Sequence, residues 1–114
     1  MSMLEKREDV RGRALLVGLC CDGMADFDNS DEDTMAELQE LLTTAGGETV
    51  LTAMQNRHTP DPRTFIGEGK AQEVKMLVEF TQSTMVVFDN ELSPKNIRAL
   101  EEIIGVTVLD RSAL

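Results

Sequence analysis

The sequence predicts an α/β fold of three layers, in which a four-stranded parallel sheet with strand order 2-1-3-4 lies between helices on both faces. Short apolar or β-branched runs alternate with longer segments whose apolar residues recur at helical spacing, in the order βαβαβαβ. Glycine, proline and capping residues separate these segments. Because crossovers between parallel strands are right-handed, we place the first helix on one face and the next two on the other.

The first half of the chain predicts two strands and one helix. Residues 14–19 form a continuous apolar run, which is typical of a strand buried on both faces. Residues 32–45 carry apolar side chains at helical spacing, and Gly46 and Gly47 follow as a helix stop. The β-rich residues 49–54 predict the second strand.

The second half begins with a segment, residues 55–66, that contains Pro60 and Pro62, and we expect no regular structure there. Ser93 and Pro94 form a helix start, because serine caps a helix and proline suits its first position. The remaining elements are predicted as a helix from Gly67 to residue 81, a strand at 85–88, a helix at 94–104 and a strand at 106–109.

A chain of 114 residues suits one domain. We expect residues 1–12 to be a flexible tail and residues 13–114 to be the α/β domain. The sequence has neither a secretory leader nor an apolar run of about 18 residues, so we expect no membrane span. Cys20 and Cys21 are adjacent, which indicates packing residues in a reducing, cytoplasmic environment rather than a disulfide framework.

The net charge of −10 argues against a classical nucleic-acid module, and we expect no contact with DNA. Residues 22–33 hold much of the acid, and we interpret them as a solvated loop and an acidic first helical turn rather than a calcium site. In contrast, the segment 57–70 contains Arg57, Arg63 and Lys70. Contact with an anion is therefore expected from this second segment.

The segment 57–70 also contains Gly67 and Gly69 directly before a helix, where backbone N–H groups and Lys70 suit a phosphate of a nucleotide or of RNA. It is not a Walker A loop, because Thr64 stands where that motif needs glycine and Ala71 where it needs serine or threonine. The alternative is that the glycines serve backbone geometry alone.

Two other segments hold candidate polar residues. His58 lies in the proline-containing segment without a partner for metal binding, so we interpret it as a surface residue. Asp89 and Asn90 end the third strand at the carboxyl edge of the sheet, where a catalytic acid could lie. We favour a role in satisfying the N–H groups of the turn before Ser93, and we assign neither a catalytic nor a metal-binding residue.

Four segments occur in an order that is similar to a known family. They are Ala-Gly-Gly at 45–47, Pro-Asp-Pro-Arg-Thr-Phe-Ile-Gly-Glu-Gly-Lys at 60–70, Val-Phe-Asp-Asn-Glu-Leu-Ser-Pro at 87–94 and Val-Leu-Asp-Arg-Ser-Ala-Leu at 108–114. Together they resemble HflX-type ribosome-associated GTPases over residues 14–114. Ser112 and Ala113 depart from the usual Thr-Gly pair of that family.

The resemblance implies a longer protein in which this α/β domain precedes a helical hairpin and a Ras-like GTPase domain. Such proteins associate with the large ribosomal subunit and split ribosomes, and their N-terminal and helical regions face ribosomal RNA. The implied partners are the large subunit with its rRNA and the protein's own helical and GTPase domains, and GTP and Mg²⁺ belong to the latter domain.

For the 114 residues themselves the resemblance implies no enzymatic activity and no cofactor. The residues expected to contact rRNA or phosphate are Arg57, Arg63, Gly67, Gly69 and Lys70. Two alternatives stay open. One is an ATP-binding module at Gly67–Lys70, since ATP binding by the N-terminal region has been proposed for some members of the family, and the other is a purely intramolecular regulator of the GTPase domain.

Overall fold

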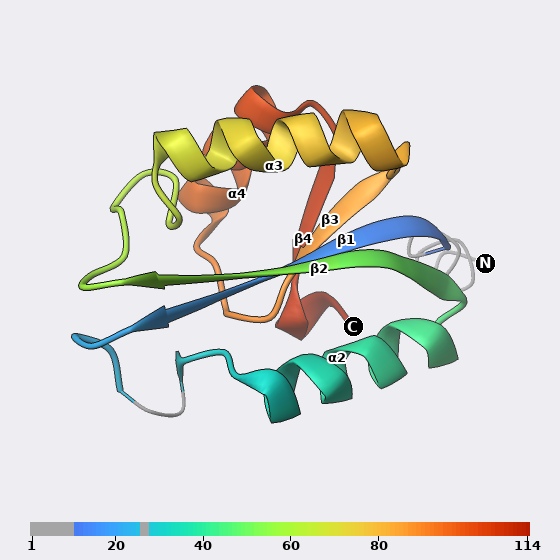
Figure 1. Cartoon of the computed structure of the whole chain (residues 1–114), viewed down its shortest axis with the longest axis horizontal. Coiled ribbons are helices and arrows are strands. Elements are labelled where there is room, and N and C mark those ends of the chain that lie inside the picture. Colours follow the sequence, from blue (N-terminus) through green and yellow to red (C-terminus); the bar gives the residue numbers. More distant parts are fainter. Residues whose placement is uncertain (1–10, 26–27) are drawn as a thin grey trace.

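The computed structural model describes residues 11–25 and 28–114, and its four strands form a single parallel sheet (Figure 1). The strand order is β2-β1-β3-β4, which confirms the predicted 2-1-3-4 topology. In chain order the elements are β1 (Gly12–Cys21), α2 (Glu32–Thr44), β2 (Gly47–Arg57), α3 (Glu68–Thr81), β3 (Met85–Phe88), α4 (Pro94–Ile104), β4 (Thr107–Asp110) and the short 3₁₀ helix η2 (Arg111–Ala113).

Helices cover both faces of the sheet, as Figure 1 shows, with α2 below the sheet and α3 and α4 above it. The alternation of side chains along β1 explains this arrangement, because successive residues point to opposite faces. Leu16 packs with the α2 residues Leu38 and Leu42, whereas Leu15 and Val17 belong to the core beneath α3 and α4. The central strands are thus buried on both faces, and their sequences are continuous apolar runs for that reason.

The two longer strands extend beyond their predicted limits. β1 begins at Gly12, the last residue of the predicted tail, and residues 1–10 of that tail lie outside the described residues. β2 continues to Arg57, so the expectation of no regular structure was wrong for residues 55–57, where pairing with β1 overrides the nearby prolines. β2 also contains one extra residue, Val50, between the partners of Ala14 and Leu15.

The helix ends follow local sequence signals in two cases. Asp31 caps α2 in a reciprocal arrangement with Thr34, and Ser93 caps α4 in the same way with Asn96. α3 differs, because it starts after Gly67, which has φ 89° and offers no side chain to cap the helix. None of the helices in the described ranges has the length and hydrophobicity needed to cross a bilayer.

Candidate functional site

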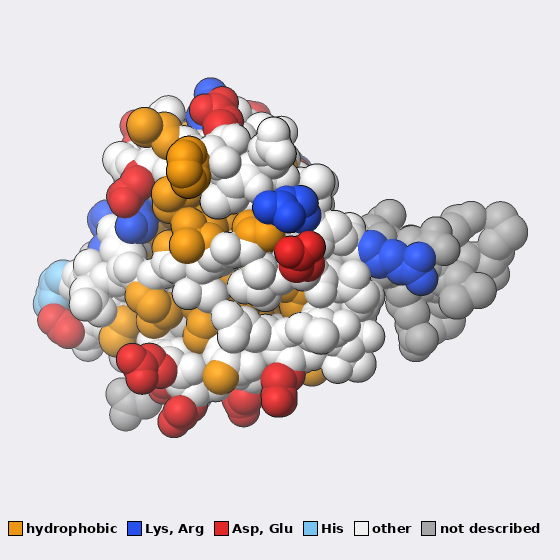
Figure 2. Space-filling view, turned by 45° about the vertical axis from the view of Figure 1, so that its right-hand side comes forward, with side chains coloured by type: hydrophobic (Ala, Val, Ile, Leu, Met, Phe, Trp, Pro, Cys, Tyr) orange, Lys and Arg blue, Asp and Glu red, His pale blue; other side chains and the backbone are white. Residues whose placement is uncertain are grey.

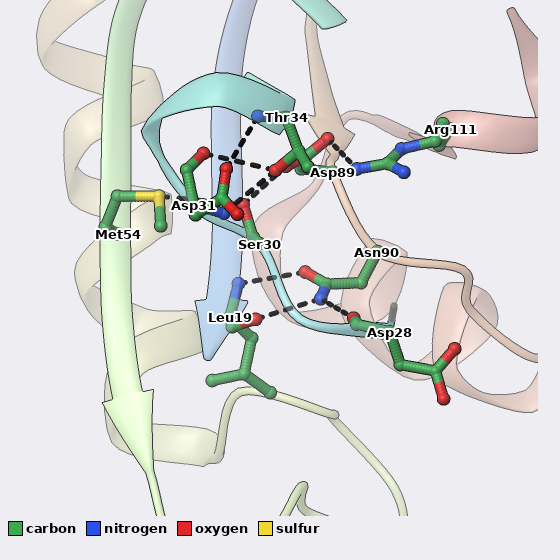
Figure 3. Close-up of polar contacts among 9 residues, drawn as sticks. All are labelled: Leu19, Asp28, Ser30, Asp31, Thr34, Met54, Asp89, Asn90 and Arg111. Carbon is green, nitrogen blue, oxygen red and sulfur yellow. Dashed lines mark hydrogen bonds and ion pairs between the residues drawn. The ribbon is translucent and has the colours of Figure 1, made fainter. Parts of the chain in front are cut away.

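The carboxyl ends of β1 and β3 meet at the point where the chain connections diverge, since α2 follows β1 on one face and α4 follows β3 on the other. Ligands of open parallel sheets bind at such a switch point. The polar side chains at this point include Ser30, Thr34, Asp89, Asn90 and Arg111. In Figure 3 Ser30, Thr34 and Arg111 point toward Asp89, whereas Asn90 points toward Leu19 and Asp28.

Asp89 is the centre of this polar cluster. Its side chain has no exposed surface, and its Oδ2 accepts hydrogen bonds from the hydroxyls of Ser30 at 2.5 Å and Thr34 at 2.6 Å. Its Oδ1 accepts from Nη2 of Arg111 at 2.5 Å (Figure 3). A buried carboxylate needs such partners, because leaving it unpaired away from water is costly. Asp89 therefore joins β3, the start of α2 and the turn after β4.

Asn90 joins two further segments. Its Oδ1 accepts from the backbone N–H of Leu19, and its Nδ2 donates to the carbonyls of Leu19 and Asp28. We had interpreted Asp89 and Asn90 as acceptors for the backbone N–H groups of the turn before Ser93, and this interpretation was wrong. The backbone N–H of Leu92 in that turn instead donates to Oδ2 of Asp110.

A cavity of about 210 Å³ adjoins the cluster and is lined by Asp28, Asp89, Asn90, Glu91 and Arg111. The oxygens of Asp89 and the amide of Asn90 are already engaged within the protein. No group of three metal-binding side chains occurs among the described residues. The cluster is thus built to hold segments together, and its buried carboxylate is poorly placed for acid–base chemistry on a ligand.

The segment between β2 and α3 is organised around Arg57. The Arg57 guanidinium donates to the carbonyls of Thr59 and Ile66, which draws the two ends of the segment together. A Cβ at Gly67 would come within 2.5 Å of Nη1 of Arg57, which is the far end of a flexible side chain, so the φ of 89° is what favours glycine there. Arg57 thus lies beside Gly67, which agrees with the alternative that this glycine serves backbone geometry.

Asp61 orders the middle of the same segment. Its Oδ1 accepts from the backbone N–H groups of Arg63 and Thr64, and these bonds lower the pKa of Asp61, with Thr64 contributing most. Asn96 of α4 donates to the carbonyls of Pro62 and Arg63 and so fixes the segment to the neighbouring helix. The segment is therefore anchored along its length despite its two prolines.

The other predicted contact residues lie just before α3 or in its first turn. Arg63 is half-exposed and lies 3.1 Å from Glu68 and 3.8 Å from Glu102. The side chain of Lys70 is only 17% exposed and lies 3.2 Å from Glu73. Gly69 faces open space. Arg63 is therefore the most accessible of the three cationic side chains, although its charge is shared with two carboxylates.

Sequence reasoning missed Ser30, Thr34 and Arg111 as members of the polar cluster. One signal could have indicated the last of these. Asp89 and Arg111 lie in two of the four segments that carry the family resemblance, and the fold brings these segments into contact. Ser30 and Thr34 gave no such signal, because serine and threonine near a helix start are explained by capping alone.

The remaining candidates behave as expected. His58 is exposed, with Nδ1 3.8 Å from the equally exposed Asp22. Cys21 is buried, and burial raises the pKa of its thiol, so it stays neutral at neutral pH. Cys20 and Cys21 are both free thiols.

Comparison with known proteins gives the family. The family model described as "GTP-binding GTPase N-terminal" matches residues 32–114. The chain is 39% identical over 84 residues to GTPase HflX of Caldanaerobacter subterraneus subsp. tengcongensis, covering 74% of this chain and 20% of that protein. GTPase HflX of Flavobacterium psychrophilum is 33% identical over 112 residues, covering 98% of this chain and 27% of that protein.

The HflX of Escherichia coli gives a similar match, with 36% identity over 86 residues, 75% of this chain and 20% of that protein. The chain thus spans between a fifth and about a quarter of the length of these relatives. Since the family model covers more than half of the sequence, the chain belongs to the GTP-binding GTPase N-terminal family.

Proposed function

We propose that this chain acts as the ribosome-contacting and regulatory domain of an HflX-type GTPase that associates with the large ribosomal subunit and splits ribosomes. Family membership is the observation that carries the proposal, because the matching relatives are named GTPase HflX. GTP hydrolysis with Mg²⁺ belongs, in this proposal, to the part of those proteins that the chain does not match. The 114 residues contribute contact and control rather than chemistry.

The proposed contact with ribosomal RNA is made by the segment 57–70. Charge supports this side of the molecule, since α2 carries Glu32, Asp33, Glu37 and Glu40 and no basic residue, and would repel phosphates. Arg63 supplies the accessible charge, and its exposed ion pairs are weak enough to be exchanged for a phosphate. Arg57 and Gly67 hold the shape of the segment, and Gly69 and Lys70 begin α3.

The test is co-sedimentation of the full-length parent protein with large ribosomal subunits over a series of salt concentrations. Arg63→Ala/Lys70→Ala should weaken binding and reduce the salt slope by about one unit for each phosphate that is no longer neutralised. Arg57 is left unchanged, because its removal would disturb the segment itself. Arg11→Ala/Arg98→Ala removes the same charge from exposed positions elsewhere and serves as the control. Equal binding by both double variants would contradict the proposed role of the segment.

A second candidate function is nucleotide binding at Gly67–Lys70. It is favoured by the lack of a side-chain cap on α3, which leaves first-turn N–H groups available to a phosphate. Calorimetry of the 114-residue chain with ATP and with GTP tests it. If millimolar nucleotide produces no heat of binding and no thermal stabilisation, this function is ruled out.

A further inference from the structure

The outer edge of the sheet at β2 has no partner strand in the described part of the chain. β2 pairs with β1 on one side only, so about half of its backbone N–H and C=O groups point away from the sheet. Edge strands usually carry a charged residue or a proline that prevents further pairing, and residues 49–56 contain neither. The backbone of this edge is therefore able to pair with one more extended segment.

Exposed hydrophobic side chains lie on the α3 side of this edge. Leu51 pairs with Leu15 of β1, which belongs to the core beneath α3 and α4, so Leu51 lies on that face of the sheet as well. On α3 itself Phe80 is 87% exposed, and Met76, one helical turn before it, is 68% exposed. In Figure 2 hydrophobic side chains form a broken band across this side of the molecule. Such a surface indicates contact with apolar side chains of a partner.

The opposite side of the same edge is bordered by the acidic helix α2. Thr52 pairs with Leu16, which packs with α2, so Thr52 lies on the face that this helix covers. The four carboxylates of α2 form no ion pair with any described residue, and the helix has no basic residue. In Figure 2 acidic side chains line the lower border of this side, where Figure 1 places α2.

Two of these carboxylates have no role in forming the helix. Glu32 and Asp33 lie in the first turn of α2, where the helix dipole favours a negative charge. Glu37 and Glu40 lie beyond that turn and are exposed. Glu37 also follows Asp33 by four residues, a spacing at which like charges repel each other. A cationic partner would relieve this repulsion.

We propose that β2 binds an extended segment of another protein in which apolar and basic side chains alternate. The segment adds a fifth strand to the sheet, and its backbone pairs with the free edge of β2. Because successive side chains of a strand point to opposite faces, its apolar side chains lie on the side of Leu51 and α3, and its basic side chains lie on the side of α2.

Charge disfavours two other occupants of this edge. A second copy of the chain would bring its own net charge of −10 to the acidic border, and the two copies would repel each other. RNA would bring phosphates to the same carboxylates. The inference is also independent of the proposed contact with ribosomal RNA, which involves the segment 57–70.

The first experiment is an NMR titration of the 114-residue chain with the end-blocked peptide Lys-Val-Lys-Val-Lys-Val-Lys. The peptide should shift the amide signals of residues 49–56 and bind with a Kd below about 1 mM. The control peptide has four lysines followed by three valines, so it has the same charge and composition but does not alternate. It should bind at least about fivefold more weakly. No shift at β2, or equal binding of the two peptides, would overturn the proposal.

Two variants locate the binding on the chain. Thr52→Lys adds a positive charge to the exposed surface of β2 and should weaken binding of the alternating peptide at least about fivefold, because it repels the lysines. Thr107→Lys makes the same change at an exposed position of β4, the opposite edge of the sheet, and should leave binding unchanged. Phe80→Ala should weaken binding through the apolar side chains, with little effect on the fold of so exposed a residue. Equal binding by the Thr52 and Thr107 variants would contradict the assignment to β2.

The second experiment separates strand pairing from loose attraction between charges. Added strands engage the outward N–H groups of an edge strand, which occur at every second residue, so the bound peptide should slow hydrogen exchange at alternate amides of residues 49–56. Signal shifts without such protection would overturn strand addition. Two further titrations test the other occupants: an oligouridylate should not shift the signals of β2, and dilution of the free chain should not shift them either. A shift with RNA, or a shift on dilution that shows self-association, would also overturn the proposal.

Discussion

At the scale of single residues, Asp89 connects three segments that are distant from one another in the sequence. Its partners Ser30 and Arg111 are 59 residues before it and 22 residues after it. No local sequence pattern predicts these contacts, because each partner can be explained by its own surroundings, as a helix cap or as a turn residue. The acidic residue at the end of β3 could be recognised from the sequence, but its role depended on the topology that surrounds it.

Asp89→Asn tests this connecting role. The substitution keeps the shape of the side chain but removes the charge that pairs with Arg111 and replaces one acceptor with a donor. We expect a loss of about 2–3 kcal/mol in the free energy of unfolding, measured with urea, because hydrogen bonds to a buried carboxylate are lost. Asp31→Asn is the control, since asparagine caps a helix as well as aspartate does. A similar small effect of both changes would show that the cluster contributes little.

Gly67 and Gly69 separate two roles that the sequence left open for the same motif. Gly67→Ala should destabilise the fold by about 1–3 kcal/mol, because its φ of 89° and ψ of 151° suit glycine almost exclusively and its Cβ would meet Arg57. Gly69→Ala should be neutral or stabilising by up to about 1 kcal/mol, since it lies in a helix and faces open space. Thermal unfolding of both variants gives the comparison, and equal destabilisation would contradict this assignment.

At the scale of elements, the sequence predicted most of what depends on neighbouring residues. The bounds of β3 and α4 agree with the prediction, because apolar runs, Ser93 and Gly105 specify them locally. The end of β2 was missed, because residues 55–57 become part of a strand only by pairing with β1. Asn56 pairs with Cys20 there, and Arg57 pairs with Cys21. Pairing energy of this kind comes from the partner strand and leaves no pattern in the strand itself.

The segment between β2 and α3 should respond to acid through Asp61. Because its pKa is lowered below its ordinary value of 3.8, the stabilisation by the ionised carboxylate is complete above that value and is lost as the pH falls through the lowered pKa. We expect the difference in unfolding free energy between wild type and Asp61→Asn to be constant near neutral pH and to shrink below about pH 4. Urea titrations across this range provide the measurement. A difference that is as large at about pH 2 as at neutral pH would argue against the charge of Asp61 as its source.

The C-terminus of α3 offers a stabilising substitution. Gln82 has φ 57°, a left-handed conformation that costs a non-glycine residue about 1 kcal/mol. Gln82→Gly should therefore stabilise the chain by about 0.5–1 kcal/mol. The same change at Gln72, an exposed residue within α3, should instead cost about 1 kcal/mol of stability. Opposite signs in the two melting temperatures are expected, and destabilisation by both would contradict the argument.

At the scale of the whole molecule, the fold places the acidic helix α2 apart from the segment 57–70. α2 presents four carboxylates on one face of the sheet, and the segment 57–70 lies on the other side. This separation follows from the topology, which sends the acidic helix and the basic segment to opposite faces. The net charge alone could not reveal this separation, whereas the uneven distribution of charge along the sequence did; contact of the segment 57–70 with an anion stays a prediction.

The net charge of −10 should also make stability depend on salt. Self-repulsion disfavours the compact state, and added salt screens it, so the free energy of unfolding should rise on the order of 1 kcal/mol between low and physiological salt. The measurement is urea unfolding in sodium chloride and in potassium chloride. Screening should act equally in both salts, whereas binding of one cation should appear in only one of them. A fall in stability with both salts would mean that attractive ion pairs outweigh the repulsion.

The position of β1 has a consequence for the order in which the protein is made. Among the four described strands, β1 leaves the ribosome first; it is a central strand, and it pairs with β2 and β3, which are synthesised later. The unit β1-α2-β2 can form once residue 57 has emerged, whereas the second side of β1 stays open until residue 88. The contact between Asp89 and Arg111 can form only after residue 111 has emerged, so this ion pair joins the two halves late in the synthesis of the described residues.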